Sequence, residues 1–597
     1  MIGGGSLTEQ QQRFAENNDE AFVQACPGAG KTRTVVARLA EIGKRLPPRH
    51  GVAVLSFTNS AVEEFIRRCT AAGLDCFLRH PSFIGTFDAF VRHFIVLPGG
   101  ITGASVRPVI VDSWDSLEVE IRLSGQYAFR GDGVSLDLFD AETNAIDPAR
   151  IGHTGLQNHV RQYRDRYEQA ARATRRRLNA AGYLSAGDAR IEARDRVRDP
   201  LRGKGLGCAL AARFHEIIVD EGQDCNPHDL EILIWLRQHG VRVSVVCDPD
   251  QAIYSFRHCD PDGLRTLRNT YPQNCQLFLS GNFRSSPPIC SMAATLRNAG
   301  DVDTAVGCTG TVTHPVVLLT YVGRGPGPIV GLAFLAQAEA VGLKLADVIV
   351  LAHARNVAQR TAGDPASGRQ SVGGSRVETF ARIVAGFWSS AATSRSREMT
   401  LRSVETLLLT LMGKRSAGEH LTRTIRREGL DARLLRRQAL SVVMGVPRAC
   451  PNSDGARAIW IARLHAEVER LELDLQPGQS VRGFFRRPPN EQWSSHLQPS
   501  DDLHLIAATI HEAKGREYDG VCVVIPPDRA PRNYTSELFD SWENRVDHEA
   551  KRVIYVGITR ARRLGVLAVP ALFGDRCAAV LELGKVPFVR RDLAKSD

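Results

Sequence analysis

Residues 21–43 of the chain read AFVQACPGAGKTRTVVARLAEIG, a short apolar run followed by a glycine-containing turn and a helical pattern. The turn matches the phosphate-loop pattern GxxxxGK[ST], with Ala25 in place of the first glycine. Glycines such as Gly28 and Gly30 let backbone amides, including that of Ala29, curl around phosphate oxygens, and the N-terminus of the next helix favours an anion. The stretch therefore predicts a strand, a phosphate-binding loop and a helix of an α/β protein.

Two residues of this loop and two acids from a later run predict the chemistry of the site. We expect Lys31 to reach the β- and γ-phosphates of a nucleoside triphosphate, and the Thr32 hydroxyl to bind Mg²⁺. A second strand-like run, HEIIVDE, ends in Asp220 and Glu221. Asp220 suits the coordination shell of the metal ion, and Glu221 suits a group that orients or deprotonates the attacking water. The two motifs together predict a nucleoside triphosphatase, or a descendant of one.

Apolar runs of this kind occur in two separated regions. The first contains AFVQA, VAVLSFT, HEIIVDE and VRVSVVCD, and the second contains DVIVLAHA, LHLIAAT and VCVVIP. Such runs followed by helical patterns are typical of buried parallel strands, so we expect two α/β sheets, each interrupted in sequence by a helical, Arg-rich insertion. The predicted segments are 1–95 with 205–285 for the first sheet, 96–204 for the first insertion, 286–375 with 500–597 for the second sheet, and 376–499 for the second insertion.

Composition indicates the kind of partner and the compartment. The chain has 597 residues and a formal net charge of +10, which favours a polyanionic partner. Nine of the 76 basic residues are Lys, so a Lys at a motif position is less often there by chance than an Arg. The 13 Cys include no CxxC pair, which indicates reduced thiols rather than a zinc or iron–sulfur site. With no signal-peptide pattern and no apolar run of about 18 residues, we expect a cytoplasmic protein without a membrane partner.

Nine segments carry a resemblance to a known family. In chain order they are LTEQQ, ACPGAGKTR, LSFTNSAVEEF, IGTFDAF, IIVDEGQD, VVCDPDQAIYSFR, GNFRSS, ATIHEAKGREYDGVCVV and VIYVGITRAR, from residue 7 to residue 562. This order strongly resembles superfamily 1 DNA helicases of the UvrD/Rep/PcrA type. The resemblance implies two RecA-like parallel-sheet domains, each interrupted by a mainly helical insertion, with ATP and Mg²⁺ between the sheets. The insertions match the family only in position and helical character.

The resemblance also implies how the nucleotide is held. Gln11 would read the adenine edge with its amide, and Arg33 and Phe283 would sandwich or flank the ring. Glu517 resembles the acid that contacts the ribose.

Three further residues complete the implied catalytic set with Lys31 and Glu221. Gln251, in CDPDQ, would sense the γ-phosphate. Arg284 and Arg560 resemble two arginine fingers from the second sheet, which would reach the transferring phosphoryl group only when the sheets close.

The resemblance also implies contacts to single-stranded DNA from aromatic, hydroxyl, Arg and His side chains. Such a set can stack on the bases and bind the DNA backbone without distinguishing one base sequence from another. These residues are Phe57, Thr58, Asn59, Thr86, Phe87, Tyr254, Phe256, Arg257, Thr509 and His511. Core packing is the competing interpretation for Phe57 and Phe87, and a hydrogen-bonded core histidine is the competing interpretation for His511.

Four positions depart from the family pattern. Phe256 replaces the usual Trp, which preserves stacking with less area, and Cys247 and Asp88 stand where Gly and His are common. Neither Cys247 nor Asp88 removes a catalytic group. Arg516 replaces a usual Leu beside Glu517, a change without an interpretation from the sequence.

The resemblance predicts an ATP-dependent 3′→5′ helicase or translocase that acts on single-stranded and tailed duplex DNA, in DNA repair or phage defence. The main alternative is a DNA-sensing ATPase or translocase switch that works with a separate nuclease subunit without productive unwinding. An RNA-directed motor is a third interpretation, because backbone contacts do not exclude a 2′-OH. A structural nucleic-acid-binding protein whose ATP site only locks a conformation is a fourth.

Overall fold

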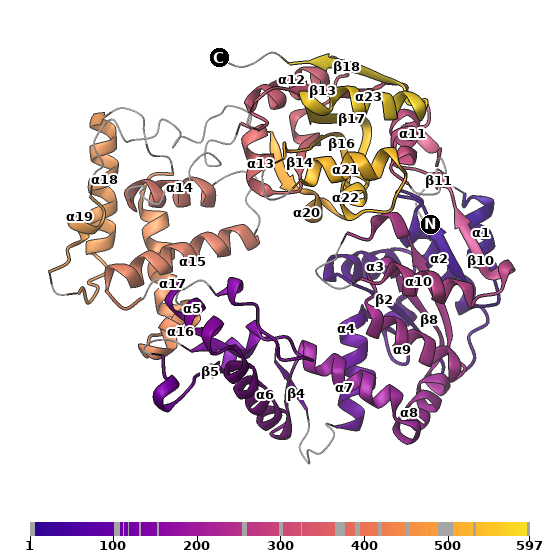
Figure 1. Ribbon diagram of the computed structural model, residues 1–597, viewed down its shortest axis with the longest axis horizontal. Coiled ribbons are helices and arrows are strands. Elements are labelled where there is room, and N and C mark those ends of the chain that lie inside the picture. The colour runs from indigo at the N-terminus through magenta and orange to yellow at the C-terminus, as the bar shows by residue number, and fades with distance from the viewer. Residues whose placement is uncertain are drawn as a thin grey trace. The chain divides into compact units, whose positions relative to one another are not determined.

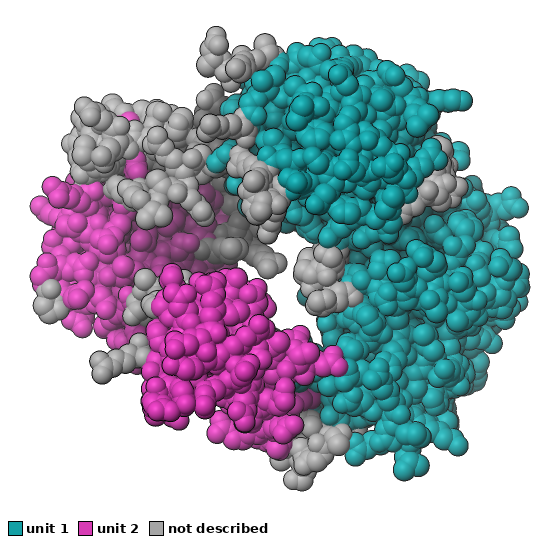
Figure 2. Space-filling view, viewed as in Figure 1, with its two compact units in different colours: residues 1–109, 186–368, 504–597 teal, residues 110–185, 369–503 magenta. Residues whose placement is uncertain are grey.

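The computed structural model describes most of the chain. The described residues are 6–100, 108–111, 113–117, 119–129, 133–151, 154–253, 259–297, 303–323, 325–363, 376–388, 394–415, 421–448, 450, 454–476, 478–486, 505–528 and 533–593. The chain divides into two compact units, residues 1–109, 186–368 and 504–597 in one and residues 110–185 and 369–503 in the other (Figure 2). Within the described residues, no helix has the length and apolar character needed to cross a membrane.

The first unit contains a six-stranded sheet in the order β10-β1-β9-β8-β2-β3, with every neighbouring pair parallel. Figure 1 labels β2, β8 and β10 of this sheet. Its strands are β1 (Phe22–Ala25), β2 (Gly51–Ser56), β3 (Phe83–Thr86), β8 (Phe214–Asp220), β9 (Arg242–Cys247) and β10 (Gln276–Leu279). The apolar run of β2 is buried along its whole length, as expected for a central strand that helices cover on both faces. Helices α2 (Lys31–Gly43) and α3 (Asn59–Ala71) share one core with this sheet, while α8 (Pro200–Arg213) and α9 (Pro227–Gln238) contact β8 and β9.

A second six-stranded parallel sheet in the same unit has the order β15-β14-β16-β17-β13-β18. Its strands are β13 (Val316–Tyr321), β14 (Val348–Ala352), β15 (Ile506–Thr509), β16 (Tyr518–Val524), β17 (Ala561–Pro570) and β18 (Phe588–Asp592). Successive side chains of β13 point to opposite faces and so enter two different cores. Val316 and Leu318 pack with α11 (Pro287–Thr295), α21 (Tyr534–Glu543), α22 (Glu549–Ile558) and α23 (Gly574–Leu583). Val317 and Leu319 pack with α12 (Pro328–Ala340) and α13 (Arg355–Thr361).

Each sheet is interrupted in sequence, as predicted. The chain leaves the first sheet after β3 and returns at β8, and it leaves the second after β14 and returns at β15. These two parallel sheets confirm the predicted α/β class with two RecA-like domains. Helices α7 (Ala186–Arg198) and α8 belong to the unit that contains both sheets. The domain boundaries drawn from the sequence remain a prediction.

The second unit contains the middle part of the first predicted insertion and the whole span of the second, each with its own apolar core. Residues 110–185 combine α5 (Thr154–Gln162) and α6 (Arg164–Ala180) with short strands around Trp114 and Tyr167. Those strands are β4 (Val109–Val111), which begins in the first unit, β5 (Glu120–Ile121), β6 (Val134–Ser135) and β7 (Tyr183–Ser185). The described part of residues 369–503 is helical and packs around Phe380 and Trp460. Its helices are α14 (Arg376–Trp388), α15 (Ser394–Leu411), α16 (Leu421–Arg427), α17 (Ala432–Gly445), α18 (Asp454–Glu469) and α19 (Val481–Phe484).

Candidate nucleotide and nucleic-acid site

The carboxyl ends of β1, β9 and β8 lie side by side because these strands are neighbours in the first sheet. They lead into the predicted phosphate loop, into residues 248–251, and into Asp220 with Glu221. Ligands of open parallel sheets bind at this edge. The predicted nucleotide-binding residues of the first sheet therefore lie along one edge, although Lys31 and Asp220 are far apart in sequence.

The phosphate loop is shaped by two glycines in the left-handed conformation, Gly28 and Gly30, each with φ of 72°. The Phe283 amide donates to the Gly28 carbonyl at 2.9 Å, which brings the segment after β11 (Gly281–Asn282) against the loop. A Cβ on Gly28 would lie 2.6 Å from both Arg284 Cβ and Asn282 Oδ1. Gly28 is therefore required by both its dihedral angle and this close approach. Helix α2 begins at Lys31, so its N-terminus opens on the loop.

Lys31 and Glu221 form an ion pair inside the site. Lys31 Nζ lies 3.3 Å from Glu221 Oε2. Burial opposes the charge on Lys31, but the carboxylates of Glu221, Asp248 and Asp220 together raise its pKa. Burial likewise disfavours the charge on Glu221, yet Lys31 and Lys514 lower the Glu221 pKa to about 2. Glu221 therefore stays ionised, as a group that polarises water must.

Asp220 fits the predicted metal ligand. Within the described part of the chain, its Oδ1 is a buried oxygen without a hydrogen-bond partner. Burial and the charge of Glu221 raise the Asp220 pKa to about 7. A divalent cation would relieve both effects, because hard oxygen ligands suit Mg²⁺. Thr32 lies in the first turn of α2, beside Lys31, so its hydroxyl belongs to the same end of the helix.

Glu221 adopts the left-handed conformation with φ of 57°, which is unusual for a residue other than glycine. Its carboxylate accepts a hydrogen bond from Gln223 Nε2, and Gln223 Oε1 accepts from the Asp248 amide at 3.0 Å. Gln223 thus connects Glu221 to the end of β9. Sequence reasoning missed Gln223 and Asp248, although both lie within the quoted segments IIVDEGQD and VVCDPDQ.

The two predicted arginine fingers come from different segments: Arg560 directly precedes β17 of the second sheet, and Arg284 follows β11. Arg560 is buried, and its Nη2 donates to Gln251 Oε1 at 3.1 Å. Burial and the positive charge of Arg284 lower the Arg560 pKa to about 9. Arg284 donates from Nε to Glu517 Oε2 at 2.9 Å and from Nη1 to the Thr559 carbonyl at 3.2 Å. The structure therefore brings Gln251, Arg284, Arg560 and Glu517 close together, while their roles at a nucleotide remain predictions.

The predicted adenine residues Gln11, Arg33 and Phe283 also lie next to the phosphate loop. Gln11, in α1 (Glu9–Glu16), donates to the Ala29 carbonyl at 2.8 Å and accepts from the Thr8 amide at 3.0 Å. In this arrangement Gln11 holds the loop and caps its own helix. Arg33 follows in the first turn of α2, and Phe283 is half-buried near Gly307.

Three predicted DNA-contacting threonines share one structural position. Thr86 and Thr509 are the last residues of β3 and β15, and Thr58 lies two residues after β2. Each hydroxyl accepts from the backbone amide three residues later. They therefore cap α3, α4 (Phe87–Phe90) and α20 (Ile510–Ala513). The carboxyl edges of both sheets thus carry the predicted strand contacts.

The aromatic and histidine predictions lie at the same edges. The Phe57 and Phe87 rings are stacked at 5.6 Å, with Phe57 half-buried and Phe87 1% exposed. Asn59 is exposed in the first turn of α3. His511 Nε2 lies 3.2 Å from the Ile253 carbonyl. Tyr254, Phe256 and Arg257 lie outside the described residues.

Three positions that depart from the family pattern lie in the described part of the chain. Cys247 is buried at the end of β9, and burial raises its thiol pKa. Asp88 forms an exposed ion pair with Arg190 at 2.6 Å, which gives the carboxylate a role on the surface of this unit. The Arg516 side chain is exposed, and its carbonyl accepts from Arg560 at 3.4 Å.

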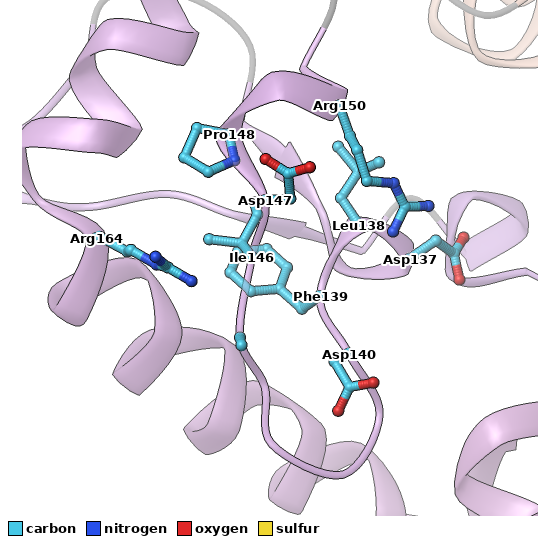
Figure 3. A pocket seen from close by; sticks show the side chains of 10 residues that line it. Asp137, Leu138, Phe139, Asp140, Ile146, Asp147, Pro148, Arg150 and Arg164 are labelled. Carbon is cyan, nitrogen blue, oxygen red and sulfur yellow. The ribbon is translucent and has the colours of Figure 1, made fainter. Parts of the chain in front are cut away.

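A separate cavity of about 540 Å³ lies in the second unit (Figure 3). Its lining residues are Asp137, Leu138, Phe139, Asp140, Ala145, Ile146, Asp147, Pro148, Arg150 and Arg164. The carboxylates serve local turns: Asp140 accepts from the Glu142 and Thr143 amides, and Asp147 accepts from the Ala149 amide. The lining contains none of the predicted site residues, so the nucleotide edge remains the candidate functional site.

Comparisons with known proteins find related helicase sequences. Residues 7–272 match the UvrD/REP helicase N-terminal domain, and residues 490–568 match the UvrD-like helicase C-terminal domain. The chain is 25% identical over 312 residues to an ATP-dependent DNA helicase PcrA of Leuconostoc citreum, covering 50% of this chain and 39% of that protein. It is 25% identical over 582 residues to an ATP-dependent DNA helicase UvrD2 of Mycobacterium tuberculosis, covering 93% of this chain and 77% of that protein.

A shorter match is 41% identical over 83 residues to one subunit of an ATP-dependent helicase/nuclease from Streptococcus pneumoniae, covering 13% of this chain and 7% of that protein. Two of the relatives, PcrA and a putative helicase YjcD of Bacillus subtilis, are matched over less than two fifths of their own length. The two family models together span more than half of the 597 residues. The chain belongs to the UvrD-like helicase family of superfamily 1.

Proposed function

We propose that this protein is an ATP-dependent motor that moves along single-stranded DNA and unwinds tailed duplexes in the 3′→5′ direction. The observation that carries the proposal is the hydrogen bond from Arg560 of the second sheet to Gln251 of the first, beside the Lys31–Glu221 pair. Residues that would contact the γ-phosphate thus come from both sheets. Family membership and the names of the relatives, which are ATP-dependent DNA helicases, support the same activity.

The proposed chemistry assigns one task to each group. Backbone amides of residues 28–30 and Lys31 would bind the phosphates, and Glu221 would polarise the attacking water. Thr32 and Asp220 would hold Mg²⁺, which neutralises phosphate charge when bound. Arg284 and Arg560 would donate to the transferring phosphoryl group, so closure of the sheets and hydrolysis depend on each other.

Nucleotide recognition and strand binding complete the proposal. Gln11, Arg33, Phe283 and Glu517 would contact the base and ribose. The DNA strand would lie along the carboxyl edges of both sheets, across the capping threonines, Phe57 and His511. Repeated closing and opening of the sheets would then move the strand.

The first test is steady-state ATP hydrolysis with and without single-stranded DNA. We expect strong stimulation by DNA in the wild type and no turnover in Lys31→Ala, because the mutant lacks the ammonium that binds the phosphates. Glu221→Gln should also lose turnover, by at least about 10²-fold, the effect of a general base, while keeping salt-sensitive DNA binding. Hydrolysis that ignores DNA would contradict the motor.

Unwinding and direction need a second test with 3′-tailed and 5′-tailed duplexes. Unwinding of the 3′-tailed duplex alone would support the proposed polarity. ATP hydrolysis stimulated by DNA without unwinding would instead favour the switch that acts with a separate nuclease. The short match to a helicase/nuclease is the observation behind that second candidate.

The proposed setting is DNA repair or phage defence. A deletion strain that becomes sensitive to DNA damage but retains normal phage plating would support repair. The reverse pattern would support defence.

A further inference from the structure

A buried hydrogen-bond relay connects Arg297 to Gln251 across the two sheets. Arg297, two residues after α11, donates from Nε and Nη2 to the Tyr555 oxygen at 3.0 and 2.7 Å. The Tyr555 hydroxyl, on α22, donates to Asp248 Oδ2 at 3.3 Å. Gln251 Nε2 donates to the same carboxylate oxygen at 2.7 Å. Asp248 Oδ2 therefore accepts two hydrogen bonds, one from the Tyr555 hydroxyl and one from the amide of Gln251, the predicted phosphate sensor.

This relay fixes which way the Gln251 amide points. A carboxylate only accepts hydrogen bonds, so the amide nitrogen must face Asp248. The amide oxygen then faces Arg560, whose guanidinium only donates and lies 3.1 Å away. The orientation of Gln251 thus depends on the position and charge of Asp248.

Tyr555 is suited to hold Asp248 in place. The side chain is fully buried, and burial together with the charge of Asp248 raises its pKa well above the ordinary value. The phenol therefore stays protonated and donates at physiological pH. Arg297 is itself held by Asp303 at 2.6 Å, so the Tyr555 oxygen has fixed donors behind it. Arg552, also on α22, donates to the Ala252 carbonyl at 2.8 Å, which anchors the helix beside the sensor segment.

We propose that Tyr555 is a positioning residue that aligns Gln251 for phosphate sensing by holding Asp248 from the second sheet. Because α22 packs on the second sheet, Gln251 is aligned while the two sheets are in contact. The inference rests on the proposed ATPase function. It adds that Tyr555 is the residue through which contact between the two sheets sets the orientation of Gln251.

The test compares two Tyr→Phe variants that each remove one buried hydroxyl. Tyr555→Phe deletes the donor to Asp248, whereas Tyr321→Phe deletes a hydroxyl that donates to the Ile525 carbonyl at 2.6 Å within the second sheet. We expect DNA-stimulated kcat to fall about tenfold in Tyr555→Phe with little change in KM, as for loss of one hydrogen bond to a charged group. Tyr321→Phe should stay within about twofold of the wild type. Equal kcat values in the two variants would overturn the proposal.

A double-mutant cycle identifies the residue through which Tyr555 acts. If the phenol works by orienting Gln251, Tyr555→Phe should cause no further loss of kcat in a Gln251→Ala background. Multiplying losses would show a separate structural effect and would also overturn the proposal.

Hydrogen exchange keeps this test independent of ATP hydrolysis. Amides of residues 248–252 bond within this segment and to Gln223, so Tyr555→Phe should speed exchange of a peptide spanning 245–252, and Tyr321→Phe should not. A wild type without ATPase activity would sink the proposed function alone. Unchanged exchange in Tyr555→Phe would sink the relay.

Discussion

Lys514 Nζ lies 2.8 Å from both carboxylate oxygens of Asp224, and this ion pair joins the two parallel sheets. Asp224 follows β8 and Lys514 follows α20, and both side chains are at least nine-tenths buried. Lys514 also donates to the Gln251 carbonyl at 3.2 Å and helps to keep Glu221 ionised. The Lys514 ammonium, next to the second sheet, therefore contacts two segments beside the first sheet. One contains Gln251 and the other contains Asp224.

Lys514→Met should destabilise the contact between the sheets, because it removes the ammonium that neutralises a buried carboxylate. Breaking a buried pair typically costs about 3–5 kcal/mol of folding free energy. Chemical denaturation would measure the loss, and Lys585→Met, at an exposed position, is the matched control. Adding Asp224→Asn should restore part of the stability. Equal stabilities of the Lys514 and Lys585 variants would show that the pair contributes nothing.

Gly28→Ala should impair nucleotide binding through a steric clash as well as backbone strain. Its Cβ would lie 2.6 Å from Arg284 Cβ, so the loop or the arginine must move. Gly73→Ala is the matched control, since Gly73 has a similar φ of 70° but no atom within 4 Å of the added Cβ. We expect both variants to lose about 1–2 kcal/mol of stability from the left-handed conformation. Affinity for a fluorescent ATP analogue should fall at least about tenfold in Gly28→Ala alone, and equal affinities would contradict the account.

The sequence predicted the features that local patterns determine. The glycines and Lys31 of the phosphate loop, the acids ending β8 and the alternation of apolar runs with helices each depend on a few neighbouring residues. Two parallel sheets, and the carboxyl edges that carry the site, follow from those runs. The family resemblance added Gln251, Arg284 and Arg560, which the structure brings to one place.

Contacts between distant segments could not be predicted in the same way. Asp224 and Lys514 are 290 residues apart, and Asp248 and Tyr555 are 307 apart, so no local periodicity reports their pairing. The rarity of Lys was a usable signal for Lys514, because it stands inside a quoted motif. The sequence also did not show how deeply each aromatic side chain is buried. Phe57 and Phe87 both stand in quoted motifs, yet Phe57 is half-buried and Phe87 lies in the core.

Arg284→Ala should reduce ATP hydrolysis by about 10³-fold or more, the range for arginine fingers. The prediction depends on Arg284 being held at the site, which its ion pair with Glu517 does at 2.9 Å. Arg562→Ala is the matched control because Arg562 pairs with the same carboxylate but is 44% exposed. We expect Arg562→Ala to stay within about twofold of the wild type, as is usual for exposed ion pairs. Single-turnover hydrolysis would measure both. Normal hydrolysis by Arg284→Ala would contradict catalysis by closure of the sheets.

Phe57→Ala and Phe87→Ala should fail in different ways. The Phe57 ring keeps one part accessible while it stacks on Phe87, so its loss should weaken binding to single-stranded DNA, with about 1–3 kcal/mol expected for one stacked base. Phe87 is 1% exposed, so Phe87→Ala should instead lower the free energy of unfolding by about 3–5 kcal/mol.

Fluorescence anisotropy at fixed salt would measure DNA affinity, and denaturation would measure stability. Phe278→Ala supplies the control, because Phe278 is an aromatic residue of the same sheet that is 47% exposed on β10, away from β2 and β3. Equal DNA affinities of the Phe57 and Phe278 variants would place the strand elsewhere. In that case the stacked pair would be a packing feature, and the capping threonines would remain as the contacts to test at this edge of the first sheet.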